Sequence, residues 1–275
     1  MSARRKPFYY FWTPNYWPHW LALGIARLLW LLPLSVQRRL FRSLGRLGYR
    51  IDKKHRTFAR RNIELCFPEL SADECDTLVL AHYEALALGL MELGLAGWAP
   101  EKKFADLLRI EGAENINAAL EQGKAVILLT GHFTTIELTG HGLREVCPKI
   151  DVVYQDHKNQ FVVELLRSAR ARGANELIEN DDVRGMVRSL RSGHALWFAP
   201  DQTARSKQCA LIPFFGQPAM TNCAASKLAR IGNAVAIPVT VDPGFPEDVV
   251  HEKAIDIKLV KQGFGDVVVA TRCRP

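Results

Sequence analysis

Residues 125–140 read AVILLTGHFTTIELTG. The apolar run Ala125–Thr130 is typical of a short strand that is buried on both faces of a sheet. Gly131 follows it directly, and from residue 136 the apolar residues recur at the three-to-four-residue spacing of a helix. The stretch therefore predicts a strand, a tight turn and a helix, the unit from which parallel sheets are built.

The same kind of apolar run recurs at Ile150–Tyr154, Ala195–Ala199 and Ala234–Val239. Helical patterns lie near residues 113–122, 136–146, 159–172, 181–192 and 220–231. Short apolar strands that alternate with helices predict an α/β fold with a mostly parallel sheet flanked by helices. We expect the functional site at the carboxyl ends of these strands.

A longer helix is expected before this region, over residues 71–95. Ser71 is suited to cap its first turn, and Glu74 three residues later completes the capping-box pattern.

The first 61 residues differ from the rest of the chain in charge. They hold 14 Lys/Arg and a single acid, Asp52, for a net charge of +13, whereas the whole chain carries +7. Trp20–Leu34 is almost wholly apolar, and an aromatic cluster between Phe8 and Trp17 precedes it. A helix over this run spans about 22 Å, short of the ~30 Å hydrocarbon core. We expect a short membrane anchor, and the sequence leaves open whether it spans the bilayer or lies in its surface.

Residues 35–51 read SVQRRLFRSLGRLGYRI. Apolar residues recur every three or four positions with arginines between them, which predicts a basic amphipathic helix suited to an anionic leaflet. The alternative is a surface helix packed on the domain. Because no nucleic-acid-binding motif accompanies the basic run, we do not expect nucleic acid as a partner. We divide the chain into an N-terminal anchor with this helix, residues 1–61, and a domain, residues 62–275.

The cysteines are scattered, and we expect reduced thiols in a cytosol-facing domain. No pair has C-x-x-C spacing and no histidine stands at zinc-finger distance, so no metal site is expected. The residues concerned are Cys66, Cys75, Cys147, Cys209, Cys223 and Cys273.

His132 and Glu137 follow the first strand at the spacing H-x-x-x-x-E. They can meet if His132 lies in the turn and Glu137 in the first turn of the helix. A carboxylate on one imidazole nitrogen fixes the tautomer, and the other nitrogen can take a proton from an attacking hydroxyl. Alternatively, Thr134 and Glu137 form a capping box, and His132 is an ordinary loop histidine.

A series of ordered motifs resembles the bacterial lipid A biosynthesis acyltransferases and covers about residues 14–240. The motifs are PNYW at 14–17, RNIELCFPELS at 61–71, GHFTTIEL at 131–138, YQDHKN at 154–159, DVRG at 182–185, WFAPDQ at 197–202 and PFFG at 213–216.

This resemblance implies an O-acyltransferase on the cytoplasmic face of the bacterial inner membrane. It implies acyl–acyl carrier protein as the donor substrate, no further cofactor, and a Kdo-bearing lipid A precursor as the acceptor. His132 is then the general base and Glu137 the carboxylate that orients it. The positive N-terminal surface would serve anionic membrane lipid and the acceptor, and could also meet the acidic carrier protein.

Three further residues are candidates for substrate binding. Arg170 falls where the family has a functional arginine and could hold an acceptor phosphate or developing oxyanion charge. Asp201 lies in the family's P-D-Q motif and could pair with Arg170 or contact the acceptor. Asn159 could instead cap the helix that follows it. A structural role is expected for Arg184, which follows two aspartates at a helix start.

The chain departs from the family pattern in two places. Thr-Ala-Arg stands at 203–205 where the family usually has Asp-Tyr-Gly, and the residues after Gln262 do not resemble the family's tail. The second departure suggests a truncated or frame-shifted product. Two alternatives to the acyltransferase interpretation therefore stay open: a non-catalytic relative that binds lipid, and an acyltransferase with another glycolipid acceptor. Phe214 and Phe215 could line an acyl slot or simply pack in the core.

Overall fold

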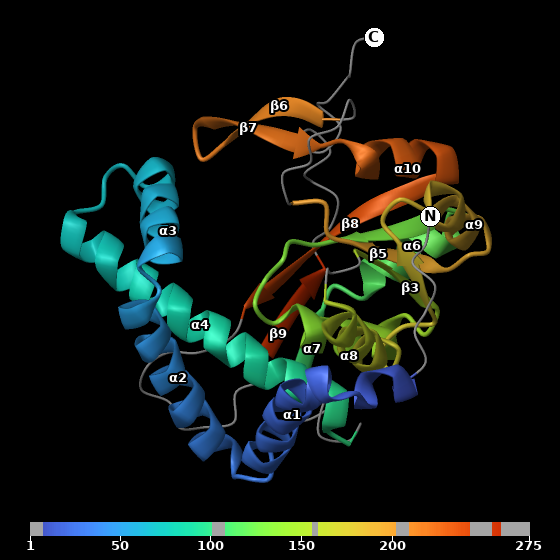
Figure 1. Cartoon of the computed structure of the whole chain (residues 1–275). Helices are drawn as coiled ribbons and strands as arrows, with labels where there is room; N and C mark the ends of the chain where they lie inside the picture. The colour runs from blue at the N-terminus through green and yellow to red at the C-terminus, as the bar shows by residue number, and fades with distance from the viewer. Residues whose placement is uncertain (1–7, 101–107, 156–158, 202–208, 243–254, 260–275) are drawn as a thin grey trace.

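The computed structural model describes residues 8–100, 108–155, 159–201, 209–242 and 255–259 (Figure 1). The N-terminal part consists of short 3-10 turns and helices: η1 Phe8–Trp12, η2 Pro14–Tyr16, α1 Trp17–Leu29, α2 Leu34–Ile51, α3 Lys53–Cys66 and α4 Ala72–Trp98. The helices of the remainder are α6 Glu114–Glu121, α7 Ile136–Val146, α8 Gln160–Arg170, α9 Val183–Arg191 and α10 Ala224–Gly232. Its strands are β1 Leu108–Glu111, β2 Ala125–Leu129, β3 Ile150–Tyr154, β4 Glu176–Glu179, β5 Ala195–Phe198, β6 Cys209–Phe214, β7 Gln217–Asn222, β8 Ala234–Asp242 and β9 Ile255–Leu259.

Seven of these strands form one sheet in the order β1-β9-β8-β2-β5-β3-β4, and β6 and β7 form a separate antiparallel hairpin. All neighbours in the large sheet run parallel except β8 and β9. The predicted α/β class with a mostly parallel sheet is therefore confirmed, and the four apolar runs are β2, β3, β5 and β8. The central strands β2 and β5 are buried on both faces, as their continuous apolar sequence requires.

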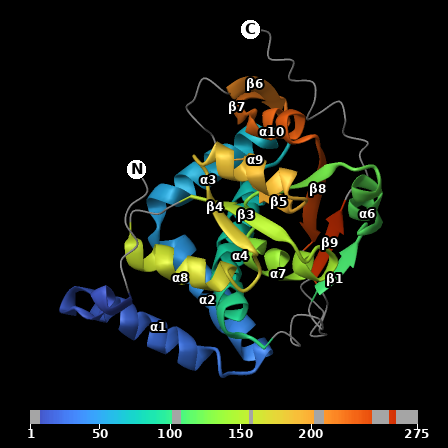
Figure 2. The ribbon, with the colours of Figure 1, turned by 90° about the vertical axis from the view of Figure 1, so that its right-hand side faces the viewer.

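Helices cover both faces of the sheet (Figures 1 and 2). On one face, α4, α6 and α7 close a core that contains Leu95, Leu138 and Trp197. On the other face, α9 and α10 close a second core around Ile127, Leu190 and Leu196. The first face carries a further layer, because α2 packs against the outside of α4.

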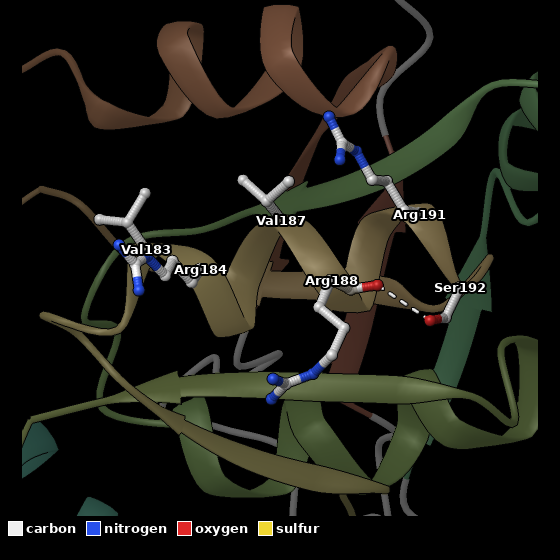
Figure 3. Close-up of a pocket in the computed structure, with 6 residues that line it drawn as sticks. All are labelled: Val183, Arg184, Val187, Arg188, Arg191 and Ser192. Carbon is white, nitrogen blue, oxygen red and sulfur yellow. Dashed lines mark hydrogen bonds between the residues drawn. The ribbon is translucent and has the colours of Figure 1, made fainter.

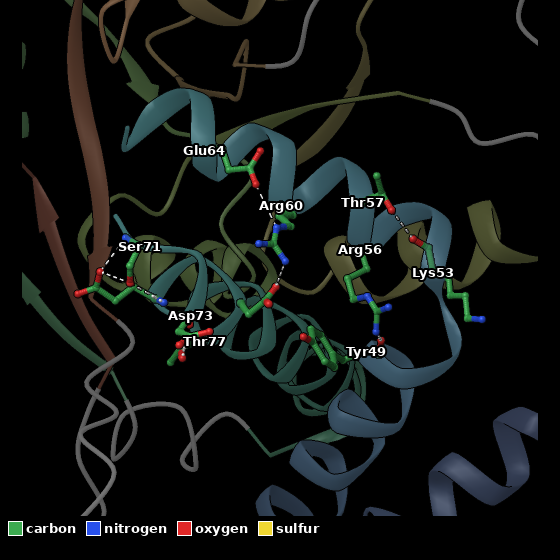
Figure 4. A network of polar contacts seen from close by, with 11 residues as sticks. Tyr49, Lys53, Arg56, Thr57, Arg60, Glu64, Ser71, Asp73 and Thr77 are labelled. Carbon is green, nitrogen blue, oxygen red and sulfur yellow. Dashed lines mark hydrogen bonds and ion pairs between the residues drawn. The ribbon is translucent and has the colours of Figure 1, made fainter. Parts of the chain in front are cut away.

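Helix α4 begins as the sequence predicts. The Ser71 side chain accepts from the Glu74 backbone N–H, and the Glu74 side chain accepts from the Ser71 N–H, which completes the capping box. Arg60 of α3 donates to Asp76 of α4 at 2.7 Å and to Glu64 at 3.0 Å, so a charged network ties the two helices together (Figure 4). Of the helices in the described ranges, α4 alone is long and apolar enough to cross a membrane, but it packs against α2, α3, α7 and α8.

The apolar run Trp20–Leu34 does not form one helix. It divides between α1, which ends at Leu29, and α2, which begins at Leu34. Pro33 stands at the junction, where its ring favours a helix start over a helix interior. The described part of α1 has 13 residues, so by itself it is too short to span a bilayer.

In α2, part of the apolar row points to solvent, whereas a polar residue and a glycine are buried. Gln37 and Gly45 are buried against the rest of the protein, whereas the apolar row that includes Leu44, Leu47 and Ile51 points outward. A β-carbon at Gly45 would lie 2.6 Å from the Tyr83 carbonyl oxygen of α4, which shows how closely the two helices approach. The amphipathic helix thus packs on the domain through Gln37, Gly45 and Phe41, and the apolar row with Leu44, Leu47 and Ile51 stays exposed.

The aromatic residues of the N-terminal segment fall into a packed group and an exposed group. The rings of Phe11, Tyr16 and Trp20 surround Phe161 of α8, with ring centroids 5.1 to 6.1 Å apart. Trp12 and Trp17 point away from this cluster and are 71% and 62% exposed. One part of the cluster therefore anchors the N-terminal segment, and the other part remains available to an apolar partner.

Candidate active site

The ends of the two central strands bring a histidine and an aspartate together. β2 and β5 are neighbours with Leu129 opposite Phe198, so the segments that leave them start side by side. Asp201 Oδ1 lies 2.5 Å from His132 Nδ1, and Asp201 Oδ2 accepts the His132 backbone N–H at 2.7 Å. Both side chains are a little over 40% exposed. Asp201 thus holds both the imidazole ring and the backbone of His132. Because a carboxylate accepts hydrogen bonds, the proton of the neutral imidazole lies on Nδ1.

Close backbone approaches hold this turn in place. A β-carbon at Gly131 would lie 3.3 Å from Asp201 Oδ2, so glycine leaves room for the carboxylate. On the other side, a β-carbon at Gly89 of α4 would lie 2.8 Å from the Thr134 carbonyl oxygen. The turn after β2 is therefore wedged between α4 and the segment after β5.

Glu137 and Arg170 form a second pair beside the turn. Glu137 lies in the first turn of α7, and Arg170 is the last residue of α8. Arg170 Nε donates to both carboxylate oxygens at 3.1 Å, and Nη2 donates to Oε1 at 2.6 Å. The side chains are only 12% and 23% exposed, so water screens this two-pronged ion pair weakly.

The four site candidates are thus paired differently from what the sequence suggested. The Nδ1 partner of His132 is Asp201, not Glu137, and the partner of Arg170 is Glu137, not Asp201. The physical reason is the strand order, because β5 lies next to β2 and delivers Asp201 to the histidine. The capping-box alternative for Glu137 is wrong, since Thr135 is the N-cap of α7 and makes no side-chain cap bond.

Asn159 lies at the start of α8. Its Oδ1 accepts the backbone N–H groups of Phe161 and Val162 at 3.0 and 3.4 Å, so it caps the helix. Its Nδ2 also lies 3.1 Å from Nε2 of His19 on α1. The capping role is confirmed, and this residue also links the N-terminal segment to the domain.

Behind the Glu137–Arg170 pair lies a small cavity of about 10 Å³, which is lined in part by His141 and Trp197. Burial, with the nearby positive charge of Arg172, lowers the pKa of His141 and favours its neutral form. Arg172 donates to the carbonyl oxygens of Gly97 and Ala99, both at 2.7 Å, and so caps the end of α4. Sequence reasoning missed this contact, although an arginine near a helix end is a common partner for terminal carbonyls.

A separate polar cluster lies at the opposite, amino edge of the sheet. His194 Nδ1 lies 2.9 Å from Asp151 Oδ2, and Asn175 donates to Asp151 Oδ1 at 3.0 Å. Burial alone would raise the pKa of Asp151, but the hydrogen bonds that it accepts outweigh burial and lower it. This cluster joins the starts of β3, β4 and β5 and lies away from the carboxyl-edge site.

Within the described ranges there is no group of three or more His, Cys, Asp or Glu side chains that could hold a metal ion. Five of the cysteines fall in these ranges, and all five are free thiols: Cys66, Cys75, Cys147, Cys209 and Cys223.

The sequence of this chain matches a known protein family over most of its length. The family model of the bacterial lipid A biosynthesis acyltransferases matches residues 8–249. The chain belongs to this family. It is 33% identical to the lipid A biosynthesis lauroyltransferase of Escherichia coli K12 over 228 residues, which cover 82% of this chain and 74% of that protein. It is 32% identical to the palmitoleoyltransferase of the same organism over 232 residues, with 83% and 74% covered. Identity to the myristoyltransferase of that organism is 25% over 231 residues, with 82% and 70% covered.

As a lipid A biosynthesis acyltransferase, the protein is an O-acyltransferase, as the sequence predicted. The matched region contains both pairs at the carboxyl edge, His132–Asp201 and Glu137–Arg170. The relatives differ in the acyl chain that their names specify, so membership of the family leaves the acyl chain of this enzyme undefined.

Proposed function

We propose that the enzyme transfers a fatty acyl chain from acyl–acyl carrier protein to a hydroxyl of a Kdo-bearing lipid A precursor, with His132 as the general base. The observation that carries the proposal is the contact of His132 Nδ1 with Asp201, which leaves Nε2 as the nitrogen that can accept a proton. The partial exposure of both side chains gives the acceptor access to this nitrogen.

The reaction needs no acyl-enzyme, that is, no covalent bond between the acyl group and the protein. His132 Nε2 takes the proton of the acceptor hydroxyl while that oxygen attacks the carbonyl carbon of the donor thioester. The carbonyl electron pair moves onto oxygen, and its return breaks the carbon–sulfur bond. The imidazolium then gives its proton to the departing thiolate, and the product is an ester. Asp201 stabilises the imidazolium throughout, because its negative charge lies against Nδ1–H.

Arg170 is proposed as a hydrogen-bond donor of the site, held in place by Glu137. Glu137 fixes the guanidinium through Nε and Nη2, and among the described residues Nη1 has no hydrogen-bond partner. Nη1 can therefore face an acceptor phosphate or the developing oxyanion. In this role Glu137 is a positioning residue, which acts on the reaction through Arg170.

We place the enzyme at the cytoplasmic face of the bacterial inner membrane, in contact with anionic lipid. Two exposed apolar rows support this: Leu21, Ile25 and Leu28 on α1, and the outward face of α2. Arginines flank the row on α2, as expected for a helix that lies on an anionic surface. This membrane would hold the lipid acceptor beside the domain.

The test is acyl transfer by membranes that carry the full chain, with acyl–acyl carrier protein thioesters and radiolabelled Kdo-lipid A precursor. We expect product from the wild type and none from His132→Ala. His55→Ala is a matched control, because His55 also pairs with an aspartate, Asp52 at 2.8 Å, but lies on α3. Wild-type rates from the His132 variant would refute the assignment. Absence of product from the folded wild type would favour a non-catalytic relative or another glycolipid acceptor.

A further inference from the structure

Helix α9 carries a row of positive charges that the proposed chemistry does not use. Its sequence VRGMVRSLR buries Met186 and Leu190 against the sheet. Arg184, Arg188 and Arg191 are spaced four and three residues apart, so they lie on the outward side and are exposed.

Within the described structure only one of these three arginines makes an ion pair, although Asp181 and Asp182 precede the helix. The best acidic contact is that of Arg188 with Glu176, at 3.8 Å between two exposed side chains. Arg184 and Arg191 have no ion pair with any described residue, and Arg230 of the neighbouring α10 adds a further exposed positive charge. Arg184 is also in the first turn, where the positive end of the helix dipole opposes a cation. Arg188 and Arg191 lie in the last turn, where the dipole favours a cation, so negative charge on a partner would relieve the unfavourable position of Arg184 alone.

The surface between the arginines has an open depression. Side chains along α9 border this depression, which measures about 450 Å³ and has Val183 and Val187 among its lining residues. Figure 3 shows Val187 and Arg191 pointing toward one side of α9 and Arg188 toward the other. An apolar floor between guanidinium groups fits a protein surface that combines carboxylates with a few apolar side chains.

The position of α9 separates this surface from the proposed membrane side. α9 and α10 cover one face of the sheet, whereas α4 covers the other and carries α2 on its outside (Figures 1 and 2). A membrane against the apolar rows of α1 and α2 would leave α9 facing the aqueous phase. A water-soluble protein can thus bind α9 while the acceptor remains in the bilayer.

The surface also lies within reach of the candidate catalytic pair. α9 follows parallel strand β4 after three residues, Asn180–Asp182, so it starts at the carboxyl edge of the sheet. It packs against β5 and β2, the strands that lead to Asp201 and His132. A thioester on a flexible arm needs only to cross this edge to meet the base.

From this arrangement we propose that the arginine face of α9 is the docking surface for the acidic carrier protein that presents the acyl thioester. This inference rests on the proposed function, because it takes the donor from there. It assigns donor binding to α9 instead of the basic α2.

The experiment measures transfer by the detergent-solubilised full chain as the concentration of acyl–acyl carrier protein is varied, and in parallel with the same acyl group on coenzyme A. For the double variant Arg184→Glu/Arg188→Glu, we expect the KM for the carrier-borne donor to rise about tenfold or more, with kcat little changed and with a weaker dependence on salt. The rate with the small donor and the KM for the lipid acceptor should stay at wild-type values. Lys124→Glu reverses the charge of an exposed residue at the amino edge of the sheet, and it is the control for loss of positive charge.

A direct binding measurement separates the two proposals. Fluorescently labelled acyl carrier protein is titrated with the wild type, the α9 variant and Arg39→Glu on the exposed side of α2. Weaker binding by the α9 variant alone is expected. Equal binding by wild type and α9 variant, or a loss confined to Arg39→Glu, would overturn the docking surface and leave the proposed function intact.

Two further outcomes concern the kinetic experiment and the donor. A raised KM for the lipid acceptor in the α9 variant would show that the arginines hold acceptor phosphate, and would also overturn the docking surface. A wild type that neither binds the carrier nor uses its thioester would refute the carrier donor itself.

Discussion

Replacing Glu92 with glutamine should change how the stability of the protein depends on pH. Glu92 lies within α4, is 2% exposed, and its Oε2 has no hydrogen-bond partner within the described structure. Burial raises the pKa of Glu92 from 4.5 to about 7, although the positive charge of Arg38 on α2 acts in the opposite direction. The folded protein therefore holds a proton at pH 6 that the unfolded chain releases.

The magnitude follows from these two pKa values. Between pH 4.5 and about 7 the folded state binds more protons than the unfolded state, so the free energy of unfolding falls as the pH rises. At 1.36 kcal/mol for each pH unit, the loss is about 3 kcal/mol, complete above pH 7 and absent below pH 4.5. A glutamine side chain does not titrate, so this loss of stability should be absent in Glu92→Gln. Because it still buries an amide and leaves Arg38 without the negative charge, we expect a net gain of only about 1–2 kcal/mol at pH 8.

The assay is denaturant unfolding of the full chain in mild detergent, followed by circular dichroism at pH 5, 6, 7 and 8. Wild type should lose stability over this range, and Glu92→Gln should lose much less, so that the two curves cross. Glu121→Gln on α6, an exposed carboxylate, is the control and should follow the wild type. Parallel pH curves for wild type and Glu92→Gln would show that the buried carboxylate is not the group that titrates.

Three other substitutions test the site and its packing. Asp201→Asn should keep the fold but lower kcat about 10²- to 10⁴-fold, because the imidazolium of His132 loses its negative partner; an activity assay that shows less than a twofold loss would contradict the pairing. Gly89→Ala should lower transfer and cost about 1–3 kcal/mol of stability, because its β-carbon would lie 2.8 Å from the Thr134 backbone carbonyl oxygen and the turn that carries His132 must shift; equal kcat in both proteins would count against this. Gly140→Ala should cost about 1–3 kcal/mol in denaturant unfolding, since its β-carbon would lie 2.4 Å from the ring of Trp197, and an unchanged midpoint would disprove the clash.

Sequence reasoning was most accurate where the local pattern is strong. The continuous apolar runs gave the central strands to within a few residues, and the amphipathic pattern gave α7 at 136–146 with the bounds that the structure has. Strands β6 and β7 were missed because Pro213 and Pro218 argue against a strand. They are nevertheless opposite each other in the hairpin, with Phe215 at a positive φ of 47° in the turn. Short strands with charged residues, such as β9 (IDIKL), gave no apolar run at all.

The residues that form the two pairs at the carboxyl edge were among the candidates named from the sequence, but how they pair was not predicted. His132 and Asp201 are 69 positions apart, so only the order of strands in the sheet brings them together. That order depends on how the strands pack, which the spacing of residues along the chain does not reveal. The five-residue interval between His132 and Glu137 instead suggested a local contact. Residues 202–208 and 260–275 lie outside the described residues, so both expected departures from the family pattern fall where the structure makes no statement.

The position of β9 has a consequence for how the protein folds during synthesis. Among the described strands, β1 pairs with β9 alone, with Leu108 opposite Ile255. The ribosome therefore completes β1 long before its partner exists, and the edge of β8 that β9 will occupy stays open meanwhile. Such a distant pairing is slow to form, and unpaired strand edges favour association between chains. The nascent enzyme should accordingly depend on chaperones until residues 255–259 emerge, and become resistant to proteases only after they have been inserted.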